Sequence, residues 1–133
     1  MTLTFLFNKY TPYKVNLFTE GDNIMKVAVI GSRSLNVDVS CYIPSEATTI
    51  VTGGAKGIDS LAEKYADEHN LKKIIFKPQY ELYKKVAPIK RNILIVNEAD
   101  LIVAIWDGKS KGTKFTIDYA KKINKSIRIF IVS

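Results

Sequence analysis

Three short segments of this sequence combine glycine, hydroxyl and cationic side chains, and each follows a run of apolar residues. Glycine lets main-chain N–H groups approach an anion closely, and the first turn of a helix adds unpaired amides and the positive end of its dipole. Residues of these types at these places indicate phosphate binding. The segments are Gly31-Ser32-Arg33, Gly53-Gly54-Ala55-Lys56-Gly57-Ile58-Asp59 and Asp107-Gly108-Lys109-Ser110-Lys111-Gly112-Thr113.

The segment from Gly53 to Gly57 carries the strongest signal for a phosphate. A tight turn needs one glycine, whereas this loop has three, with Lys56 at the start of the next predicted helix. We therefore expect a phosphate against the main-chain amides of this loop. The GSR segment, taken alone, is also compatible with an ordinary turn between a strand and a helix.

Two common nucleotide-binding patterns do not fit the spacing. The GKS string at residues 108–110 resembles the end of a Walker A motif, but that motif requires glycine where this sequence has Val103 inside an apolar run. No GxGxxG string follows the first predicted strand. A P-loop nucleoside triphosphatase and an ordinary dinucleotide dehydrogenase are therefore not expected.

Residues for acid–base or metal chemistry are scarce. Asp59 and Asp107 are the carboxylates nearest the three segments and are the candidates for catalysis, with capping of its own loop as the alternative for Asp59. One cysteine and one histidine cannot build a Cys/His metal site, so we expect neither a metal nor a cofactor. Tyr80 and Tyr83 follow a predicted strand and are candidates for lining a base pocket.

The elements that would position these segments alternate along the chain. Continuous β-branched runs indicate buried parallel strands, and stretches with apolar residues at helical spacing separate them. This alternation predicts an α/β, Rossmann-like fold with an open, mainly parallel five-stranded sheet and helices on both faces. Ligands of such sheets bind beyond the carboxyl ends of the strands. The expected strands are 26–31, 47–52, 72–78, 100–106 and 126–133.

Four helical stretches are expected between these strands. The one after residue 80 is expected to break near Pro88 and to bury one side. That buried side is expected to carry Ile89, Ile93 and Val96. The expected helices are 35–43, a helix from the 53–57 loop to about residue 69, 80–98 and 112–123.

The 133-residue chain carries a formal net charge of +7, and its charges are unevenly distributed. Residues 1–69 hold six Lys/Arg and eight Asp/Glu, whereas residues 70–133 hold fourteen and five, which gives −2 and +9. A basic half suits an anionic partner such as a nucleotide or a nucleic acid, and the alternative is a solvated lysine-rich surface. Length and composition indicate one globular domain.

The N-terminal residues 1–24 differ in composition from residues 25–133, which we expect to form the nucleotide-binding domain. Residues 1–24 alternate partly at period two, which predicts a hairpin, and the alternative is an upstream start assigned in error, with the native chain beginning at Met25. No apolar run is long enough to span a bilayer, and a single cysteine suits a reducing compartment. We expect a cytoplasmic protein without a membrane partner. The sequence is compatible with a monomer and with a homo-oligomer.

Four parts of the sequence resemble the SLOG superfamily, the Rossmann-like group that includes DNA-processing protein A and the LONELY GUY hydrolases. They are VAVIGSR, IVTGGAKGIDSLAEKYA, the pair Arg91-Asn92 and DLIVAIWDGKSKGT. The resemblance covers about residues 25–133 and looks most like a small stand-alone bacterial branch. It implies that a nucleotide, a nucleotide-derived signal or single-stranded DNA binds at the three loops, with Arg91 facing phosphate or ribose. The residues expected to contact the ligand are Gly31, Ser32, Arg33, Gly53, Gly54, Ala55, Lys56, Gly57, Asp59, Arg91, Asn92, Ser110, Gly112 and Thr113.

The LONELY GUY motif PGGxGTxxE is only partly present. Its Gly-Thr pair falls on Gly112-Thr113, but Gly108-Lys109-Ser110 replaces its first three residues, and Thr116 stands where the motif has a catalytic glutamate. A threonine cannot act as a carboxylic acid or base at neutral pH. We therefore expect a nucleotide-binding or sensing domain. The alternatives are an enzyme that hydrolyses a nucleotide N-glycosidic bond and a module that binds single-stranded DNA.

Overall fold

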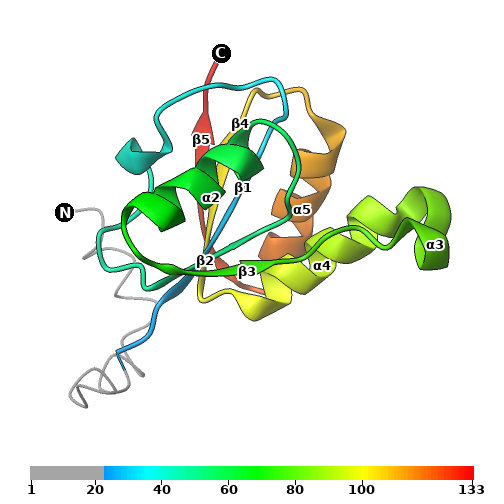
Figure 1. Cartoon of the computed structure of the whole chain (residues 1–133). Coiled ribbons are helices and arrows are strands. Elements are labelled where there is room, and N and C mark those ends of the chain that lie inside the picture. Colours follow the sequence, from blue (N-terminus) through cyan, green and yellow to red (C-terminus); the bar gives the residue numbers. More distant parts are fainter. Residues whose placement is uncertain (1–22) are drawn as a thin grey trace.

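The computed structural model describes residues 23–133, which form one sheet with helices packed against it (Figure 1). All five strands run parallel, in the order β3-β2-β1-β4-β5, which confirms the predicted fold class. The hairpin predicted within residues 1–24 falls almost entirely in residues 1–22, outside the described part of the chain. The strands are β1 (Lys26–Gly31), β2 (Thr49–Thr52), β3 (Lys72–Ile75), β4 (Leu101–Trp106) and β5 (Ser126–Ile131).

The centre of the sheet is formed by β1 and β4, whose sequences are almost entirely apolar. Residues 27–29 of β1 and 101–105 of β4 have no exposed surface. Such continuous apolar runs suit strands that are covered on both faces. Successive side chains alternate between two cores, so that Val27 and Val29 pack in one cluster while Ala28 and Ile30 pack in the other.

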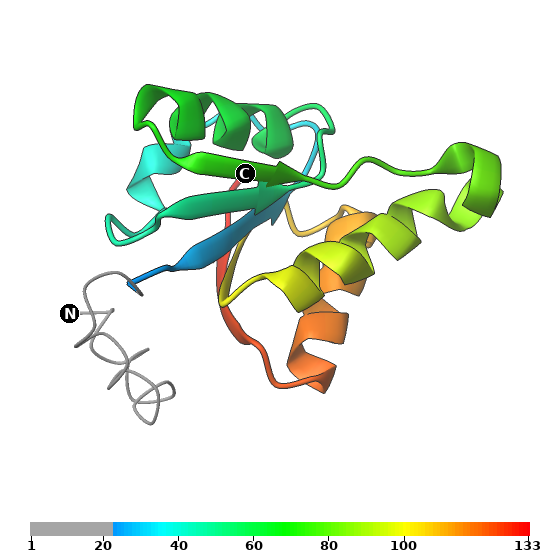
Figure 2. The same ribbon diagram turned by 60° about the horizontal axis from the view of Figure 1, so that its bottom comes forward.

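Helices cover both faces of the sheet (Figure 2). The helix α2 (Ile58–Glu68) packs on one core, whereas α4 (Ala87–Glu98) and α5 (Lys111–Lys122) pack on the other. The chain builds outward from β1 through β2 to β3, then crosses back to β4 and β5. This reversal leaves a crevice beyond the carboxyl ends of β1 and β4, which is where open parallel sheets bind ligands.

The helix predicted at 35–43 is not formed. The only helical part of this stretch is the short 3₁₀ helix η3 (Val39–Cys41). The carboxylate of Asp38 accepts hydrogen bonds from the main-chain N of Ser40 (3.1 Å) and from its hydroxyl (2.6 Å). Local side-chain bonds of this kind compete with the hydrogen bonds of a helix. The apolar residues whose spacing suggested the helix still reach the core, namely Leu35, Val39 and Ile43.

The helical stretch after residue 80 breaks earlier than predicted. It consists of α3 (Tyr80–Tyr83), a 3₁₀ turn η4 (Lys84–Val86) and then α4, and the break lies at Lys84, whose φ is 53°. Pro88 sits in the first turn of α4, where its missing N–H costs no helical hydrogen bond.

The buried side of α4 also differs from the prediction. Ile89 is 38% exposed, while Val96 is fully buried as expected. The stripe that faces the sheet contains Ala87, Arg91 and Ile95, spaced four residues apart. An arginine therefore occupies a position on this stripe that an apolar residue would ordinarily fill.

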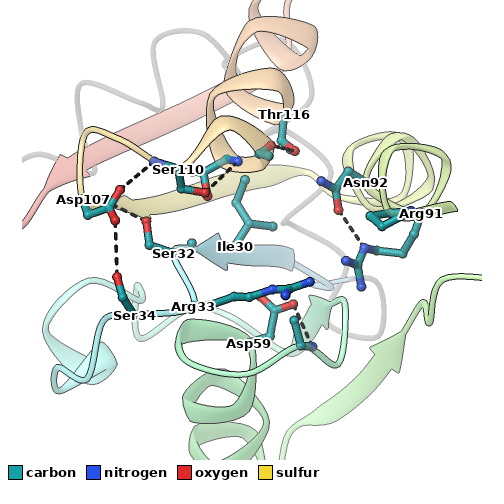
Figure 3. A pocket seen from close by; sticks show the side chains of 15 residues that line it. Ile30, Ser32, Arg33, Ser34, Asp59, Arg91, Asn92, Asp107, Ser110 and Thr116 are labelled. Atoms are coloured by element: carbon teal, nitrogen blue, oxygen red, sulfur yellow. Dashed lines mark hydrogen bonds between the residues drawn. The ribbon is translucent and has the colours of Figure 1, made fainter. Parts of the chain in front are cut away.

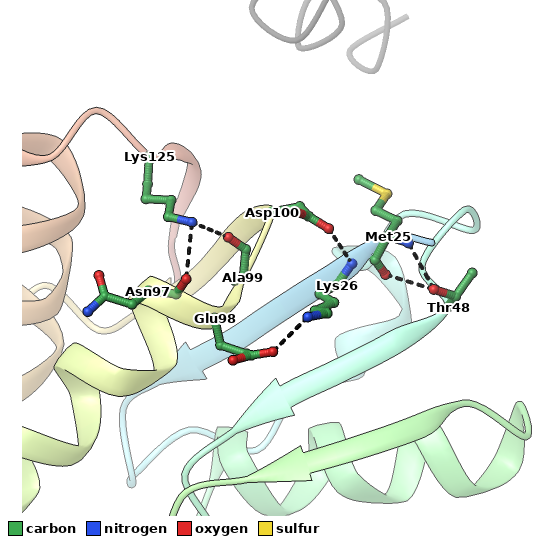
Figure 4. Close-up of polar contacts among 8 residues, drawn as sticks. All are labelled: Met25, Lys26, Thr48, Asn97, Glu98, Ala99, Asp100 and Lys125. Carbon is green, nitrogen blue, oxygen red and sulfur yellow. Dashed lines mark hydrogen bonds and ion pairs between the residues drawn. The ribbon is translucent and has the colours of Figure 1, made fainter. Parts of the chain in front are cut away.

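Polar contacts tie the strands together at the end of the sheet opposite the crevice (Figure 4). The main-chain N of Lys26 donates to the carboxylate of Asp100 (2.9 Å), and its ammonium group pairs with Glu98 (2.7 Å). The main-chain N of Met25 donates to the hydroxyl of Thr48 (2.9 Å). These contacts fix the start of β1 between its two neighbours. None of the helices between residues 23 and 133 combines the length and apolar character needed to cross a membrane.

We expect Gly31→Ala to destabilise the fold. A Cβ at Gly31 would lie 2.2 Å from the carbonyl oxygen of Ile105 and 2.6 Å from the Ile58 side chain. Forcing extra volume into a packed core costs about 1 to 3 kcal/mol. The matched control is Gly112→Ala, because a Cβ there meets nothing within 4 Å and alanine favours the helix. Urea unfolding measures both variants, and a Gly31→Ala protein as stable as the parent would contradict the packing described.

Candidate anion-binding site

A cavity of about 410 Å³ lies at the carboxyl ends of β1 and β4, beside the first turns of α2, α4 and α5 (Figure 3). The structure brings ten of the predicted ligand-contacting residues together around it. These are Gly31, Ser32, Arg33, Ala55, Asp59, Arg91, Asn92, Ser110, Gly112 and Thr113.

A second cavity of about 290 Å³ adjoins the first and contains three more of the predicted residues, Gly53, Gly54 and Lys56. The two cavities share Arg33, Ala55 and Arg91 as a common wall. Gly57 lines neither of them. Its φ is +74°, and a Cβ there would lie 2.4 Å from the carbonyl oxygen of Arg33, so Gly57 lets the two loops touch.

Five further residues line the first cavity that were not predicted to contact the ligand, namely Ile30, Ser34, Pro88, Asp107 and Thr116. Ser34 directly follows Arg33, and Pro88 lies three residues before Arg91 on the same helix. Both positions could have been found by extending each segment by one residue or one helical turn.

Arg91 is held in place by main-chain carbonyl groups. Only 7% of the residue is exposed. Its Nη1 donates to the carbonyl of Gly53 and, at 3.4 Å, to that of Phe76, while its Nε donates to the side-chain oxygen of Asn92 (2.7 Å). The guanidinium therefore braces the ends of β2 and β3. Gly53 must lack a side chain, because a Cβ would collide with this guanidinium.

Asp59 lies near the same guanidinium group and is 7% exposed. Its carboxylate accepts a hydrogen bond from the main-chain N of Ala55 (3.1 Å). Burial raises the pKa of Asp59, although the Ala55 amide and Arg91 act in the opposite direction. The carboxylate thus takes up one of the amides that a phosphate on the 53–57 loop would use, and a phosphate at that loop stays a prediction.

Arg33 approaches Arg91 at the wall that the two cavities share. Figure 3 shows its side chain extending over Asp59 toward the Arg91 guanidinium. Burial lowers the pKa of Arg91; Asp59 and Tyr80 raise that pKa, and the like charge of Arg33 lowers it further. Two cations and one buried carboxylate therefore meet at the wall between the cavities.

Asp107 organises the loop between β4 and α5. Its carboxylate accepts from the main-chain N of Ser110 and of Lys109, both at 2.8 Å, and from the hydroxyl of Ser34 (3.3 Å). These hydrogen bonds, led by that from Ser110, lower the pKa of Asp107 to about 2. A group with this pKa is ionised at neutral pH and is too weak a base for efficient proton transfer. Asp107 is thus an anchor of the loop.

The hydroxyl groups around the cavity are largely engaged within the protein. The hydroxyl of Ser32 accepts from the main-chain N of Asp107 (3.0 Å), which ties the end of β1 to the end of β4. The hydroxyl of Ser110 caps α5 by accepting from the main-chain N of Thr113 (3.4 Å). The hydroxyl of Thr116 donates to the carbonyl of Gly112 (2.9 Å).

Among residues 23–133, no three His, Cys, Asp or Glu side chains are grouped so that they could hold a metal ion. The ring N–H of Trp106 donates to the carbonyl of Ser110 (3.0 Å). This bond connects the end of β4 to the start of α5.

We expect Asp59→Asn to stabilise the protein at pH 7. Because the pKa of Asp59 in the folded chain lies above 3.8, ionisation of the carboxyl opposes folding. Below pH 3.8 the Asp59 carboxyl is protonated and does not oppose folding. As the pH rises through the pKa of Asp59 in the folded chain, the free energy of unfolding decreases. The gain from asparagine should therefore be largest at pH 7 and small near pH 3, as measured by urea unfolding.

The control for this comparison is Asp118→Asn, because Asp118 is exposed and pairs with Lys114 on the surface of α5. It should change the free energy of unfolding by no more than about 0.5 kcal/mol at either pH. A less stable Asp59→Asn variant at pH 7 would show that the ionised carboxylate is a net stabilising partner of Arg91.

Comparison with known proteins identifies the fold. No family model and no curated protein matches this chain. The structure is similar to that of DNA processing protein A from Streptococcus pneumoniae, with a TM-score of 0.68 and 21% sequence identity. The match covers 83% of this chain and 51% of that one, so this chain spans about half of its length. Residues 23–133 thus have the Rossmann-type fold also found in DNA processing protein A.

Proposed function

We propose that this chain binds the phosphate group of a nucleotide or nucleotide-derived small molecule between Arg33 and Arg91. The observation that carries the proposal is the approach of these two guanidinium groups on one cavity wall, with Asp59 as the buried carboxylate beside them. Two like charges held close together repel each other, and a bound dianion would relieve that repulsion. Guanidinium groups also match the geometry of phosphate oxygens.

The remainder of the first cavity suits the sugar or base of such a ligand. Its volume of about 410 Å³ falls within the range of small-molecule sites. Gly31 and Gly112 have no side chains, so their main-chain groups face the cavity. The side-chain oxygen of Asn92 accepts a hydrogen bond from Arg91, which leaves its NH₂ group as a donor for the ligand. These groups support recognition of a polar organic molecule that carries a phosphate.

Binding is favoured over hydrolysis because the carboxylates at the cavity are committed to the loops. Asp107 anchors the β4–α5 loop with a pKa of about 2. Asp59 holds the Ala55 amide, and the hydroxyl of Thr116 is bonded to Gly112. A ligand-sensing or ligand-carrying role of residues 25–133 therefore fits this arrangement better than cleavage of an N-glycosidic bond.

Arg33→Ala tests the proposal with little risk to the fold, because Arg33 is exposed. Loss of a charge-assisted hydrogen bond should weaken binding of a nucleoside monophosphate by about 10- to 100-fold. Calorimetry with the four nucleoside monophosphates measures the effect, and thermal unfolding should show an unchanged midpoint. Lys122→Ala, an exposed cation at the far end of α5, is the matched control. Unchanged affinity in Arg33→Ala would remove the proposed site.

Binding of single-stranded DNA is the second candidate. It is favoured by the fold shared with a protein named for DNA processing and by the basic C-terminal half of this chain. A protein that contacts six to ten phosphates loses about 10³- to 10⁵-fold in affinity between 50 and 200 mM salt. A single phosphate between two arginines should lose far less. We expect the affinity for nucleoside monophosphates to fall only slightly as the salt concentration rises. If a 20-nucleotide strand binds more tightly than the monophosphates and its affinity falls steeply with salt, DNA is favoured as the ligand.

A further inference from the structure

The two cavities meet at the cationic wall, and this arrangement bears on the size of the ligand. Arg33 and Arg91 line both cavities, so an anion held between them borders both spaces at once. A ligand that ended at this anion would fill one cavity and leave the other to water. A ligand that continued past it would use both.

The second cavity has its own chemistry. Besides the residues of the shared wall, Gly54, Lys56, Pro78 and Tyr80 line it. The φ of Gly54 is +73°, and a Cβ there would lie 3.3 Å from the Ile75 side chain, so this wall stays free of a side chain. This lining suits a nucleoside, because bases stack on aromatic side chains and sugar hydroxyls form hydrogen bonds with cationic and main-chain groups.

Tyr80 is the aromatic residue that lines the second cavity, and 54% of it is exposed. It begins α3, which projects from the body of the domain at the end of the segment after β3 (Figure 2). This single turn is closed by the carbonyl of Gln79, which accepts from the main-chain N of Leu82 (3.1 Å) and of Tyr83 (2.9 Å). The ring is thus held at the rim of the second cavity without being packed in the core.

We infer that the ligand consists of two nucleosides joined through a phosphate bridge. The bridge lies between Arg33 and Arg91, one nucleoside occupies the first cavity, and the base of the other stacks on Tyr80 with Lys56 beside its sugar. This inference rests on the proposed function, because it needs the phosphate at the two arginines. It adds the ligand class and assigns recognition to Tyr80.

The test compares probes that differ only in the second nucleoside. The four nucleoside 5′-diphosphates and the four symmetric dinucleoside 5′,5′-pyrophosphates are titrated into the full chain by calorimetry. At least one dinucleotide should bind about tenfold or more tightly than its mononucleotide, which is within the contribution of one stacked base. Dinucleotides that bind no better than mononucleotides would overturn the inference and leave the proposed function standing. Absence of binding by all eight probes would overturn both.

Variants on the projecting turn assign the effect to a residue. Tyr80→Ala should abolish the tenfold advantage of the dinucleotide while leaving mononucleotide affinity unchanged, and Tyr80→Phe should retain it because the ring remains. Tyr83→Ala is the matched control, since Tyr83 lies on the same turn, is 37% exposed and lines neither cavity. Equal losses in Tyr80→Ala and Tyr83→Ala, or none in Tyr80→Ala, would show that the second base does not stack on Tyr80.

Discussion

Burial of the Arg91 guanidinium constrains the carboxyl end of the sheet more than any other contact. A charged group removed from water needs acceptors and a nearby opposite charge, or it destabilises the fold by several kcal/mol. The carbonyl groups of Gly53 and Phe76 supply the acceptors. The nearby Asp59 carboxylate raises the pKa of Arg91, although its own burial opposes its ionisation. One side chain from α4 thereby fixes the ends of β2 and β3 and requires glycine at position 53.

The opposite wall of the site is fixed by neutral groups and by one ionised carboxylate. Ser32 connects the end of β1 to that of β4, and Asp107 shapes the first turn before α5. Arg33 reaches into the cavity from between these anchors and is exposed. Most of the site is therefore rigid before any ligand arrives, and a rigid site loses less conformational entropy on binding. Arg33 is left as the group that can adjust to the anion.

Much of the fold followed from local sequence patterns. The five strands were predictable because continuous β-branched runs have few alternatives to burial in a parallel sheet. The site segments were predictable because the carboxyl ends of parallel strands meet at one edge. The main-chain amides that donate to the Asp107 carboxylate also lie two and three residues away, which is a spacing that a sequence can reveal.

Other features depended on contacts between residues distant in sequence. The spacing of apolar residues on α4 favoured Ile89 as a buried residue. Arg91 is buried there, and the Gly53 carbonyl that accepts its hydrogen bond lies 38 residues away in the sequence, so the local pattern does not reveal it. The hydrogen bond between the Asp59 carboxylate and the Ala55 amide competes with the phosphate expected on that loop. The effect of this bond on the ionisation of Asp59 depends on how deeply the carboxyl is buried. The division of the crevice into two cavities arises from Arg33 and Arg91, which belong to different parts of the chain.

A crystal structure of the chain with a bound nucleoside monophosphate is the most direct test of the proposed anion site. We expect the phosphate between the guanidinium groups of Arg33 and Arg91, with Asp59 still bonded to the Ala55 amide. A phosphate seated on the amides of residues 53–57 with Asp59 displaced, or a phosphate outside the crevice, would contradict the proposed site.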